Sequence, residues 1–324
     1  IENELIYGSV SGRKSNEDGE DLGGALIGIF QTGTTEYTKE NAIATATSKD
    51  DGSFSFEEVP YGTWVIREIE SPKGYVLSEE EISVTISEVD EVVEVELVNY
   101  FITGNIALTK VDKDYPENKL TGAVFEVYSD TNEDGKLDKK DELLGEMGEV
   151  EKGVYQMDDL RYGRYLVREK TAPTGFVLDE NIYPVSIEEN GKTYNVENEA
   201  GKGFLNEAQK GSLKIVKTSS DGKVEGFSFH VTGKDYDQTF TTDKNGEIVI
   251  DGLCIGEYTI SEVSDKASSG YILPADQKVT IKTDETATVT MHNELRDTPK
   301  TGDDFSLGLW VSLAVAFTIG AGIR

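Results

Sequence analysis

The chain contains an internal repeat, marked by a lysine, a glutamate and an asparagine that recur three times in the same order. The three sets are Lys14, Glu68 and Asn99; Lys110, Glu169 and Asn206; and Lys217, Glu262 and Asn293. One glycine stands six residues before each lysine, and another stands six residues before each glutamate. Long units that recur in a fixed order predict three separate domains along the chain.

Apolar and polar residues alternate within each repeat, which is typical of β-strands that bury one face. The segments that lead to the second and third lysines show it: residues 106–110 read Ile-x-Leu-x-Lys and residues 213–217 read Leu-x-Ile-x-Lys. Turn dipeptides such as Asn245-Gly246 separate the alternating segments. Many short strands with turns between them predict an all-β chain of three tandem, Ig-like β-sandwiches.

The same alternation places the lysine, the glutamate and the asparagine on the apolar faces of their strands. Lys110 shares a face with Ile106 and Leu108, and Glu169 shares one with Tyr165. Burial disfavours charge, so it lowers the pKa of a lysine and raises that of a glutamate. A neutral amine can then attack the carboxamide, while a protonated carboxyl polarises the carbonyl oxygen and passes its proton to departing ammonia. We predict an isopeptide bond between lysine and asparagine in each repeat, with the glutamate as catalyst. The alternative is a buried ion pair beside an amide.

Two positions depart from a uniform pattern. In the first repeat Gly12 replaces a bulky residue before Lys14, so the packing around this lysine is expected to differ. In the second repeat Asn198 also lies on an apolar face and competes with Asn206 for the cross-link. We favour Asn206, because its distance of five residues to Gly211 equals the corresponding distance in the first repeat.

An acidic loop in the second repeat matches the EF-hand calcium pattern. Its candidate ligands are Asp130, Asn132, Asp134, Lys136, Asp138 and Asp141. Glycine stands at the sixth position of the loop, Lys136 offers only its backbone carbonyl, and aspartate replaces the usual glutamate at the twelfth. The spacing predicts a Ca²⁺ site, and the alternative is an acidic turn that carries Asp-Gly.

The C-terminal part of the chain combines a short motif with a hydrophobic run. The motif is Thr298, Pro299, Lys300, Thr301 and Gly302. It resembles the sortase signal Leu-Pro-x-Thr-Gly, with threonine in place of leucine. Residues 305–323 carry no charge, and this run is close to the ~20 residues that a membrane-spanning helix needs. We predict that sortase cuts after Thr301 and joins its carboxyl to peptidoglycan or to a pilin lysine.

The residues around two of the glutamates resemble a known signature. Residues 165–176 read Tyr-Leu-Val-Arg-Glu-Lys-Thr-Ala-Pro-Thr-Gly-Phe, and residues 64–75 keep the glutamate, the proline and the glycine. The third repeat keeps Glu262 and Gly270 but lacks the proline. The pattern resembles the collagen-adhesin B-type repeat, also called the SpaA-like or prealbumin-like domain, of LPXTG-anchored Gram-positive surface proteins. The resemblance covers residues 7–295 and implies a prealbumin-like fold with Lys–Asn isopeptide bonds formed beside an acidic catalyst.

The sequence therefore predicts six segments. They are the tail of a truncated preceding repeat (1–6), B-type repeat 1 (7–100), B-type repeat 2 with the calcium loop (101–208), B-type repeat 3 (209–295), a sortase-signal linker (296–304) and a membrane-spanning sorting segment (305–324). The formal net charge of -31 makes nucleic acid an unsuitable partner.

From these features we expect an extracellular surface adhesin or stalk, anchored to the cell wall of a Gram-positive bacterium and not an enzyme. Its expected partners are sortase and either peptidoglycan or pilin subunits, and its C-terminal helix crosses the membrane before sorting. The sequence names no host or environmental ligand for a binding region upstream. Two alternatives stay open: a pilin subunit polymerised by sortase, and the stem of a wall-anchored secreted enzyme whose catalytic domain precedes Ile1.

Overall fold

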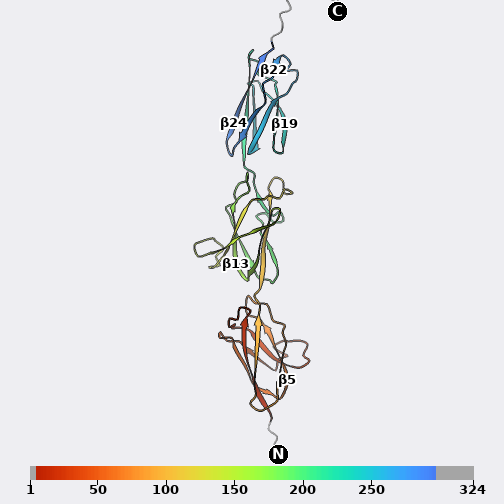
Figure 1. The fold of residues 1–324 in the computed structure, drawn as a ribbon, viewed down its shortest axis with the longest axis vertical. Coiled ribbons are helices and arrows are strands. Elements are labelled where there is room, and N and C mark those ends of the chain that lie inside the picture. Colours follow the sequence, from red (N-terminus) through yellow and green to blue (C-terminus); the bar gives the residue numbers. More distant parts are fainter. Residues whose placement is uncertain (1–4, 297–324) are drawn as a thin grey trace, which may run out of the picture. The chain divides into compact units, whose positions relative to one another are not determined.

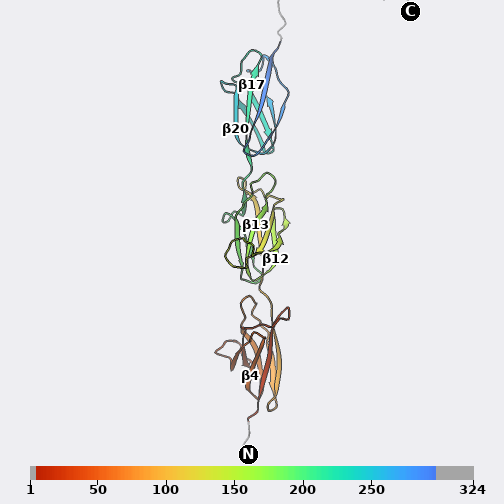
Figure 2. The ribbon, with the colours of Figure 1, turned by 90° about the vertical axis from the view of Figure 1, so that its left-hand side faces the viewer.

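The computed structural model describes residues 5–296, and this part of the chain is all β, with no helix. Figures 1 and 2 show the strands of each repeat gathered in their own domain. One compact unit holds the first two repeats and ends at Ala208, and a second begins at Gln209. The structure therefore confirms the all-β fold that the alternation of apolar residues predicts for residues 5–296.

Repeat 1 consists of two sheets that enclose one hydrophobic core. Its strands are β1 (Tyr7–Asn16), β2 (Leu26–Gln31), β3 (Ala44–Thr47), β4 (Ser53–Pro60), β5 (Gly62–Glu70), β6 (Ile82–Ile86) and β7 (Val92–Asn99). One sheet has the order β4-β1-β7 and the other has the order β3-β2-β5-β6. Gly12 lies on β1 where a side chain would collide with the ring of Phe54, so the missing side chain makes room for this phenylalanine.

Repeat 2 has the same plan with additional short strands. Its strands are β8 (Thr103–Asp112), β9 (Val124–Ser129), β10 (Glu142–Glu146), β11 (Gly148–Glu151), β12 (Val154–Arg161), β13 (Gly163–Thr171), β14 (Ile182–Ile187), β15 (Thr193–Asn195) and β16 (Phe204–Asn206). The sheets run β10-β9-β13-β14 and β11-β12-β8-β15, and β16 also pairs with β8. Phe125 packs edge-on against Tyr155 and Phe204 in the core between them.

Repeat 3 repeats this arrangement with eight strands. They are β17 (Lys210–Ser219), β18 (Ser228–Gly233), β19 (Tyr236–Thr241), β20 (Glu247–Cys254), β21 (Gly256–Glu262), β22 (Tyr271–Ile272), β23 (Gln277–Ile281) and β24 (Thr286–Leu295). Its sheets have the orders β20-β17-β24-β22 and β19-β18-β21-β23. Each repeat has a core of its own, as expected for separate domains.

The first strand of every repeat pairs in parallel with the last one. β1 lies parallel to β7, β8 to β16, and β17 to β24. Parallel neighbours require a long connection, and here the rest of the domain supplies it. The two strands that connect a repeat to the chain on either side are therefore neighbours in its sheet.

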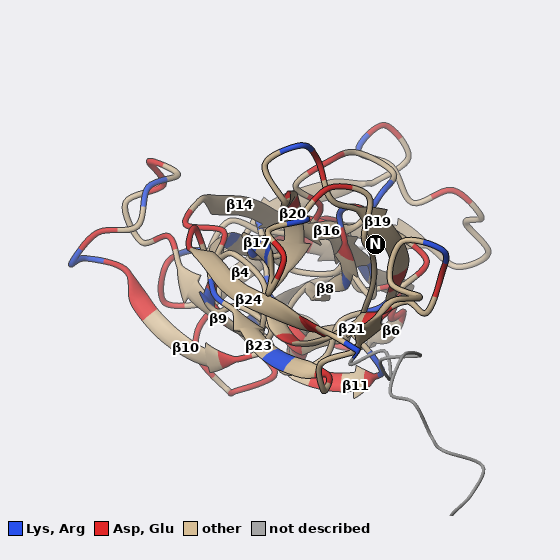
Figure 3. Ribbon diagram, turned by 90° about the horizontal axis from the view of Figure 1, so that it is seen from above, with Lys and Arg blue, Asp and Glu red and all other residues tan. Residues whose placement is uncertain are grey.

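The acidic residues are spread over loops and strands of the described chain (Figure 3). Within residues 5–296 no helix is long and apolar enough to cross a membrane. The predicted sortase motif at 298–302 and the predicted membrane segment at 305–324 lie outside the described residues, as do residues 1–4 of the predicted N-terminal tail.

Candidate intramolecular cross-link sites

The lysine and the asparagine of each repeat lie on neighbouring strands in one shared register. The lysine pairs with the residue two positions before the asparagine: Lys14 with Leu97, Lys110 with Phe204, and Lys217 with Met291. Residues two apart on a strand share a face, so the asparagine side chain points to the same side as the lysine. A long side chain can reach such a diagonal neighbour.

The glutamate reaches the pair from the facing sheet, on β5, β13 or β21. All nine side chains are buried, with exposed fractions between 0% and 9%. The structure thus places every lysine, glutamate and asparagine on the side that the alternation predicts. Polar groups at this depth generally require hydrogen-bond partners.

In repeat 1 the three side chains touch one another. The Nζ atom of Lys14 contacts Oδ1 of Asn99 directly and lies 3.6 Å from Oε1 of Glu68. Asn99 donates its amide Nδ2 to both carboxyl oxygens of Glu68, at 3.0 Å each. Burial lowers the pKa of Lys14, and the charge of Glu68 opposes that shift only in part. The amine is therefore shifted toward its nucleophilic form while it lies against the carboxamide.

Repeat 2 has the same geometry. The Nζ atom of Lys110 contacts Oδ1 of Asn206 and lies 3.3 Å from Oε1 of Glu169, and Asn206 donates Nδ2 to both carboxyl oxygens at 2.9 Å. Burial lowers the pKa of Lys110 to about 8. Asn198 is placed elsewhere, because its side chain bonds to the backbone of Leu205 and to a neighbouring carboxylate. The structure therefore brings Asn206, and not Asn198, to the lysine.

A backbone amide also contacts the glutamate in these two repeats. Ser78 donates its N–H to Oε2 of Glu68 at 2.7 Å, and Asp179 donates its N–H to Oε2 of Glu169 at 2.9 Å. Sequence reasoning missed both donors, because a backbone donor leaves no trace in residue type. The available signal was positional, since each donor stands four residues after the glycine of the glutamate signature.

Repeat 3 brings the same residues together but connects them differently. Lys217 donates to the backbone carbonyls of Thr218 at 2.6 Å and Met291 at 3.5 Å. Asn293 donates Nδ2 to Oε1 of Glu262 at 2.6 Å, whereas Oε2 of Glu262 and Oδ1 of Asn293 have no hydrogen-bond partner. Burial lowers the pKa of Lys217 and raises that of Glu262. The third amine is thus not bonded to the carboxamide.

The orientation of the carboxamide corrects one expectation from the sequence. We expected the carboxyl to bond to the carbonyl oxygen of the asparagine, but in all three repeats it accepts from the amide nitrogen. In the first two repeats the physical reason is that the lysine amine occupies the oxygen side. In repeat 3 the carboxamide oxygen has no partner, and the amide nitrogen alone contacts the carboxyl. A carboxyl beside the amide nitrogen is well placed to protonate the group that must leave as ammonia.

The predicted calcium loop is a network of turns in the described structure. The buried carboxylate of Asp130 accepts the backbone N–H groups of Asp134 and Gly135, and Asp141 accepts that of Asp138. The Asn132 side chain donates to both Asp134 and Asp138. Within residues 5–296 no group of three or more His, Cys, Asp or Glu side chains is arranged to hold a metal ion. In the described structure the carboxylates of Asp130 and Asp141 therefore face backbone N–H groups of their own loop.

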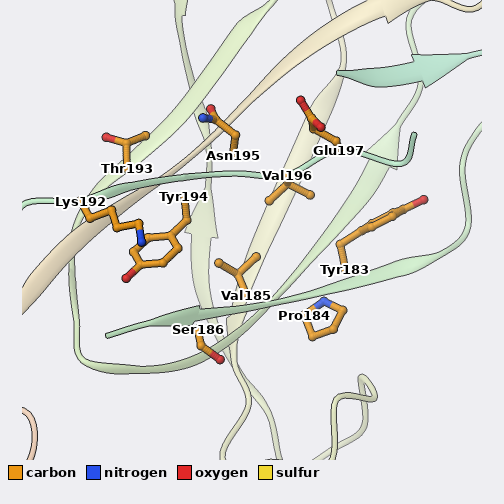
Figure 4. A pocket seen from close by; sticks show the side chains of 10 residues that line it. All are labelled: Tyr183, Pro184, Val185, Ser186, Lys192, Thr193, Tyr194, Asn195, Val196 and Glu197. Carbon is orange, nitrogen blue, oxygen red and sulfur yellow. The ribbon is translucent and has the colours of Figure 1, made fainter. Parts of the chain in front are cut away.

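A pocket in repeat 2 lies outside the three sites. Its walls are residues 183–186 at β14 and residues 192–197 at β15, and Figure 4 shows the tyrosines Tyr183 and Tyr194 among them. The wall includes no residue of the lysine, glutamate and asparagine sets. It therefore adds nothing to the chemistry of the candidate sites.

Comparison with known structures gives long matches. The Bacillus anthracis TIE protein matches with a TM-score of 0.72 and 25% identity, over 89% of this chain and 51% of that chain. BcpA, the major pilin subunit of Bacillus cereus, matches with a TM-score of 0.42 and 15% identity, over 89% of this chain and 99% of that chain. This chain spans about half the length of the TIE protein structure. No curated protein matches it.

A family model supplies the assignment. The model described as the SpaA prealbumin-like fold domain matches three separate stretches, residues 8–100, 104–202 and 211–295. Each stretch contains one lysine and one glutamate of the repeated sets. The resemblance seen in the sequence is thereby confirmed: the chain belongs to the SpaA family of prealbumin-like fold domains and carries three of them.

Proposed function

We propose that this chain is the stalk of a Gram-positive, cell-wall-anchored surface protein whose domains are locked by Lys–Asn isopeptide bonds. The observation that carries the proposal is the direct contact of a buried lysine amine with an asparagine carboxamide, beside a buried glutamate, in repeats 1 and 2. A structural ion pair would not need the carboxamide, whereas amide formation does.

The reaction exchanges one amide for another. The lysine Nζ forms a bond to the asparagine Cγ, the bond from Cγ to Nδ2 breaks, and one proton passes from Nζ through the glutamate to the leaving nitrogen. The products are an isopeptide and one ammonia, so the step needs no oxidant and no cofactor. Positioning of the amine against the carboxamide supplies the main acceleration, because it makes the attack intramolecular.

Such a bond would change how a repeat bears load. It would join the first strand to the parallel last strand, and sequence separations of 85 and 96 residues lie between the bonded residues of repeats 1 and 2. By the loop-closure estimate used for disulfides, a cross-link over that distance adds about 4–5 kcal/mol of stability. A pull on the two ends of a repeat would then load a covalent amide instead of hydrogen bonds alone.

The test is a mass measurement on the full chain followed by peptide mapping. Each cross-linked repeat loses the mass of one ammonia, and the lysine and asparagine peptides of that repeat appear as one branched species. Glu169→Ala should restore the full mass of repeat 2 only, while Glu188→Ala, at an exposed glutamate of the same repeat, should not. A full mass in all three repeats of the unmutated chain would overturn the proposal.

Wall attachment is the second part of the proposal. The motif at 298–302 and the uncharged run after it support attachment by sortase to peptidoglycan or to another pilin subunit. Incubation of the full chain with a sortase and a small amine should transfer the amine to Thr301. A Thr301→Ala variant should block the transfer, and a chain whose motif is left intact under these conditions would contradict this part.

We also propose that residues 130–141 bind Ca²⁺, on the spacing of their oxygen groups. The buried Asp130 and the amide of Asn132, which lies between two carboxylates, support the proposal. The carboxylates would have to turn from the backbone N–H groups toward the ion. If the carboxylates keep their bonds to the backbone, the loop is an acidic turn and binds no ion. A calcium titration decides between the calcium site and the acidic turn.

A further inference from the structure

The three candidate sites differ in one backbone donor, and the sequence accounts for the difference. Repeats 1 and 2 have the N–H donors of Ser78 and Asp179 on the carboxyl of their glutamates. In repeat 3 the corresponding carboxyl oxygen, Oε2 of Glu262, has no partner although the side chain is buried. An unpaired buried oxygen is costly, so the missing donor needs a cause.

The strand pairing identifies the equivalent position in repeat 3. After each glutamate a glycine is followed by an aromatic residue, and that residue pairs with the position two after the asparagine: Tyr75 with Phe101, Phe176 with Ala208, and Tyr271 with Leu295. The donor is the third residue after this aromatic one in the first two repeats. The third residue after Tyr271 is Pro274.

Proline has no backbone N–H, so it cannot make this hydrogen bond. The loop from glutamate to glycine is also two residues longer in repeat 3, since seven residues lie between Glu262 and Gly270 and five lie between Glu169 and Gly175. Without a hydrogen bond from the backbone, the Glu262 carboxyl accepts the Asn293 amide N–H through one oxygen only. In repeats 1 and 2 both oxygens accept it.

The lysine of repeat 3 is turned away as well. Its amine donates to two backbone carbonyls, on Thr218 and Met291, and Oδ1 of Asn293 has no partner. In the other two repeats the amine contacts that oxygen. The third site thus has its three residues in the core but lacks the contact between nucleophile and carboxamide.

We infer that the backbone N–H at Ser78 and Asp179 is a positioning group for cross-link formation. Pro274, which lacks this N–H, makes the third repeat form its cross-link more slowly than the other two. This inference rests on the proposed isopeptide chemistry and predicts in which repeats the bond forms quickly and in which it forms slowly. A small misplacement of reacting atoms can cost on the order of a hundredfold in rate, which sets the expected scale. Burial lowers the pKa of Lys217, as it does the pKa of the other two lysines, so the three sites differ in the orientation of the amine and not in the direction of this shift.

The experiment is a pulse–chase measurement on the full chain. Cells that express the chain receive a short pulse of isotope-labelled lysine, samples are denatured in acid at intervals, and the branched peptide of each repeat is quantified by mass spectrometry. Repeats 1 and 2 serve as internal controls for repeat 3. We expect their branched peptides to be complete while that of repeat 3 is still forming, with a rate on the order of a hundredfold lower.

Variants separate the backbone donor from other causes. Pro274→Ala restores an N–H and should speed closure of repeat 3, whereas Leu273→Ala at the neighbouring position should not. Ser78→Pro removes the donor of repeat 1 and should slow that repeat alone, while Ser78→Ala keeps the N–H and should close at the normal rate. If Ser78→Pro disturbs folding of repeat 1, the rate measured for Pro274→Ala still tests the inference.

The outcomes distinguish this inference from the proposed function. Absence of all three branched peptides would refute the isopeptide proposal and the inference with it. Equal rates in all three repeats, or no change in repeat 3 on Pro274→Ala, would refute the inference alone. Slow closure of repeat 3 that Pro274→Ala accelerates would support both.

Discussion

Removal of the glutamate in repeat 2 should lower the stability of that repeat by the loop-closure contribution of one cross-link. Lys110 and Asn206 are 96 residues apart in the chain. For a closed loop of about that length the entropy estimate gives about 4–5 kcal/mol. Glu169→Ala keeps both partners of the bond but removes the group that moves the proton. The variant should therefore lose this contribution, and its uncompensated buried lysine adds to the loss.

Hydrogen exchange on the full chain measures this loss repeat by repeat. Amides in the buried strands β8 and β13 should exchange faster by roughly a factor of a thousand, since each factor of ten corresponds to about 1.4 kcal/mol. Amides of repeat 3 should be unchanged and serve as the internal control. Asn198→Ala is the matched control variant, because this asparagine is not at the lysine and its loss should leave the cross-link mass intact.

Two results would refute this reasoning. If Glu169→Ala shows the mass of the cross-linked repeat, the glutamate is not required for the bond. If the variant lacks the bond but its exchange rates equal those of the unmutated chain, the bond does not stabilise the repeat by closing a loop. A restored full mass in Asn198→Ala would show that the wrong asparagine was assigned.

Three further predictions follow from particular contacts. Burial alone would raise the pKa of Glu126, but hydrogen bonds from Tyr128, Lys170 and Arg168 outweigh it and lower the pKa to about 2. The ionised carboxylate therefore stabilises repeat 2 at pH values above the ordinary glutamate pKa, and this contribution is lost as the pH falls toward 2. Glu126→Gln should flatten the acid branch of the melting curve between about pH 4.5 and pH 2 relative to Glu188→Gln, and parallel curves would contradict the assignment. Added Ca²⁺ should raise the melting temperature of the unmutated chain over that in chelator but leave Asp130→Ala unchanged; equal shifts in both would favour the acidic turn. Gly12→Ala should destabilise repeat 1 by about 1–3 kcal/mol in urea unfolding, because the new methyl group meets the Phe54 ring, while Ser11→Ala on the exposed side should have little effect.

The sequence predicts which residues meet in the first two sites, and the reason is geometric. A period of two fixes the side of a strand on which each side chain lies, so a lysine that follows Ile106 and Leu108 must enter the core. Repetition then indicates the partners, because the same three residue types recur in the same order in every repeat. The same logic selects Asn206 over Asn198, which the structure places in a different set of hydrogen bonds.

The details that set reactivity could not be predicted in this way. The donors at Ser78 and Asp179 depend on the path of a loop, and their side chains play no part in the contact with the glutamate. Two backbone carbonyls and the carboxamide compete to accept a hydrogen bond from the Lys217 amine. The spacing of residues in the sequence does not show which of them the amine contacts. Proline at 274 was visible in the sequence, but its meaning required the strand pairing that aligns it with the two donors.

The position of the lysine within its strand indicates what a cross-link would protect. Each of the three lysines is the eighth residue of a strand of ten residues, β1, β8 or β17. Because the last strand runs parallel to the first, the asparagine lies at the same end of the pair. A load that enters at the start of β1 would therefore run along most of that strand before it crosses at Lys14 to Asn99 and leaves the repeat. Residues 15–98, which include the whole of strands β2 to β6, would lie between the two ends of the amide and would bear no tension along the chain.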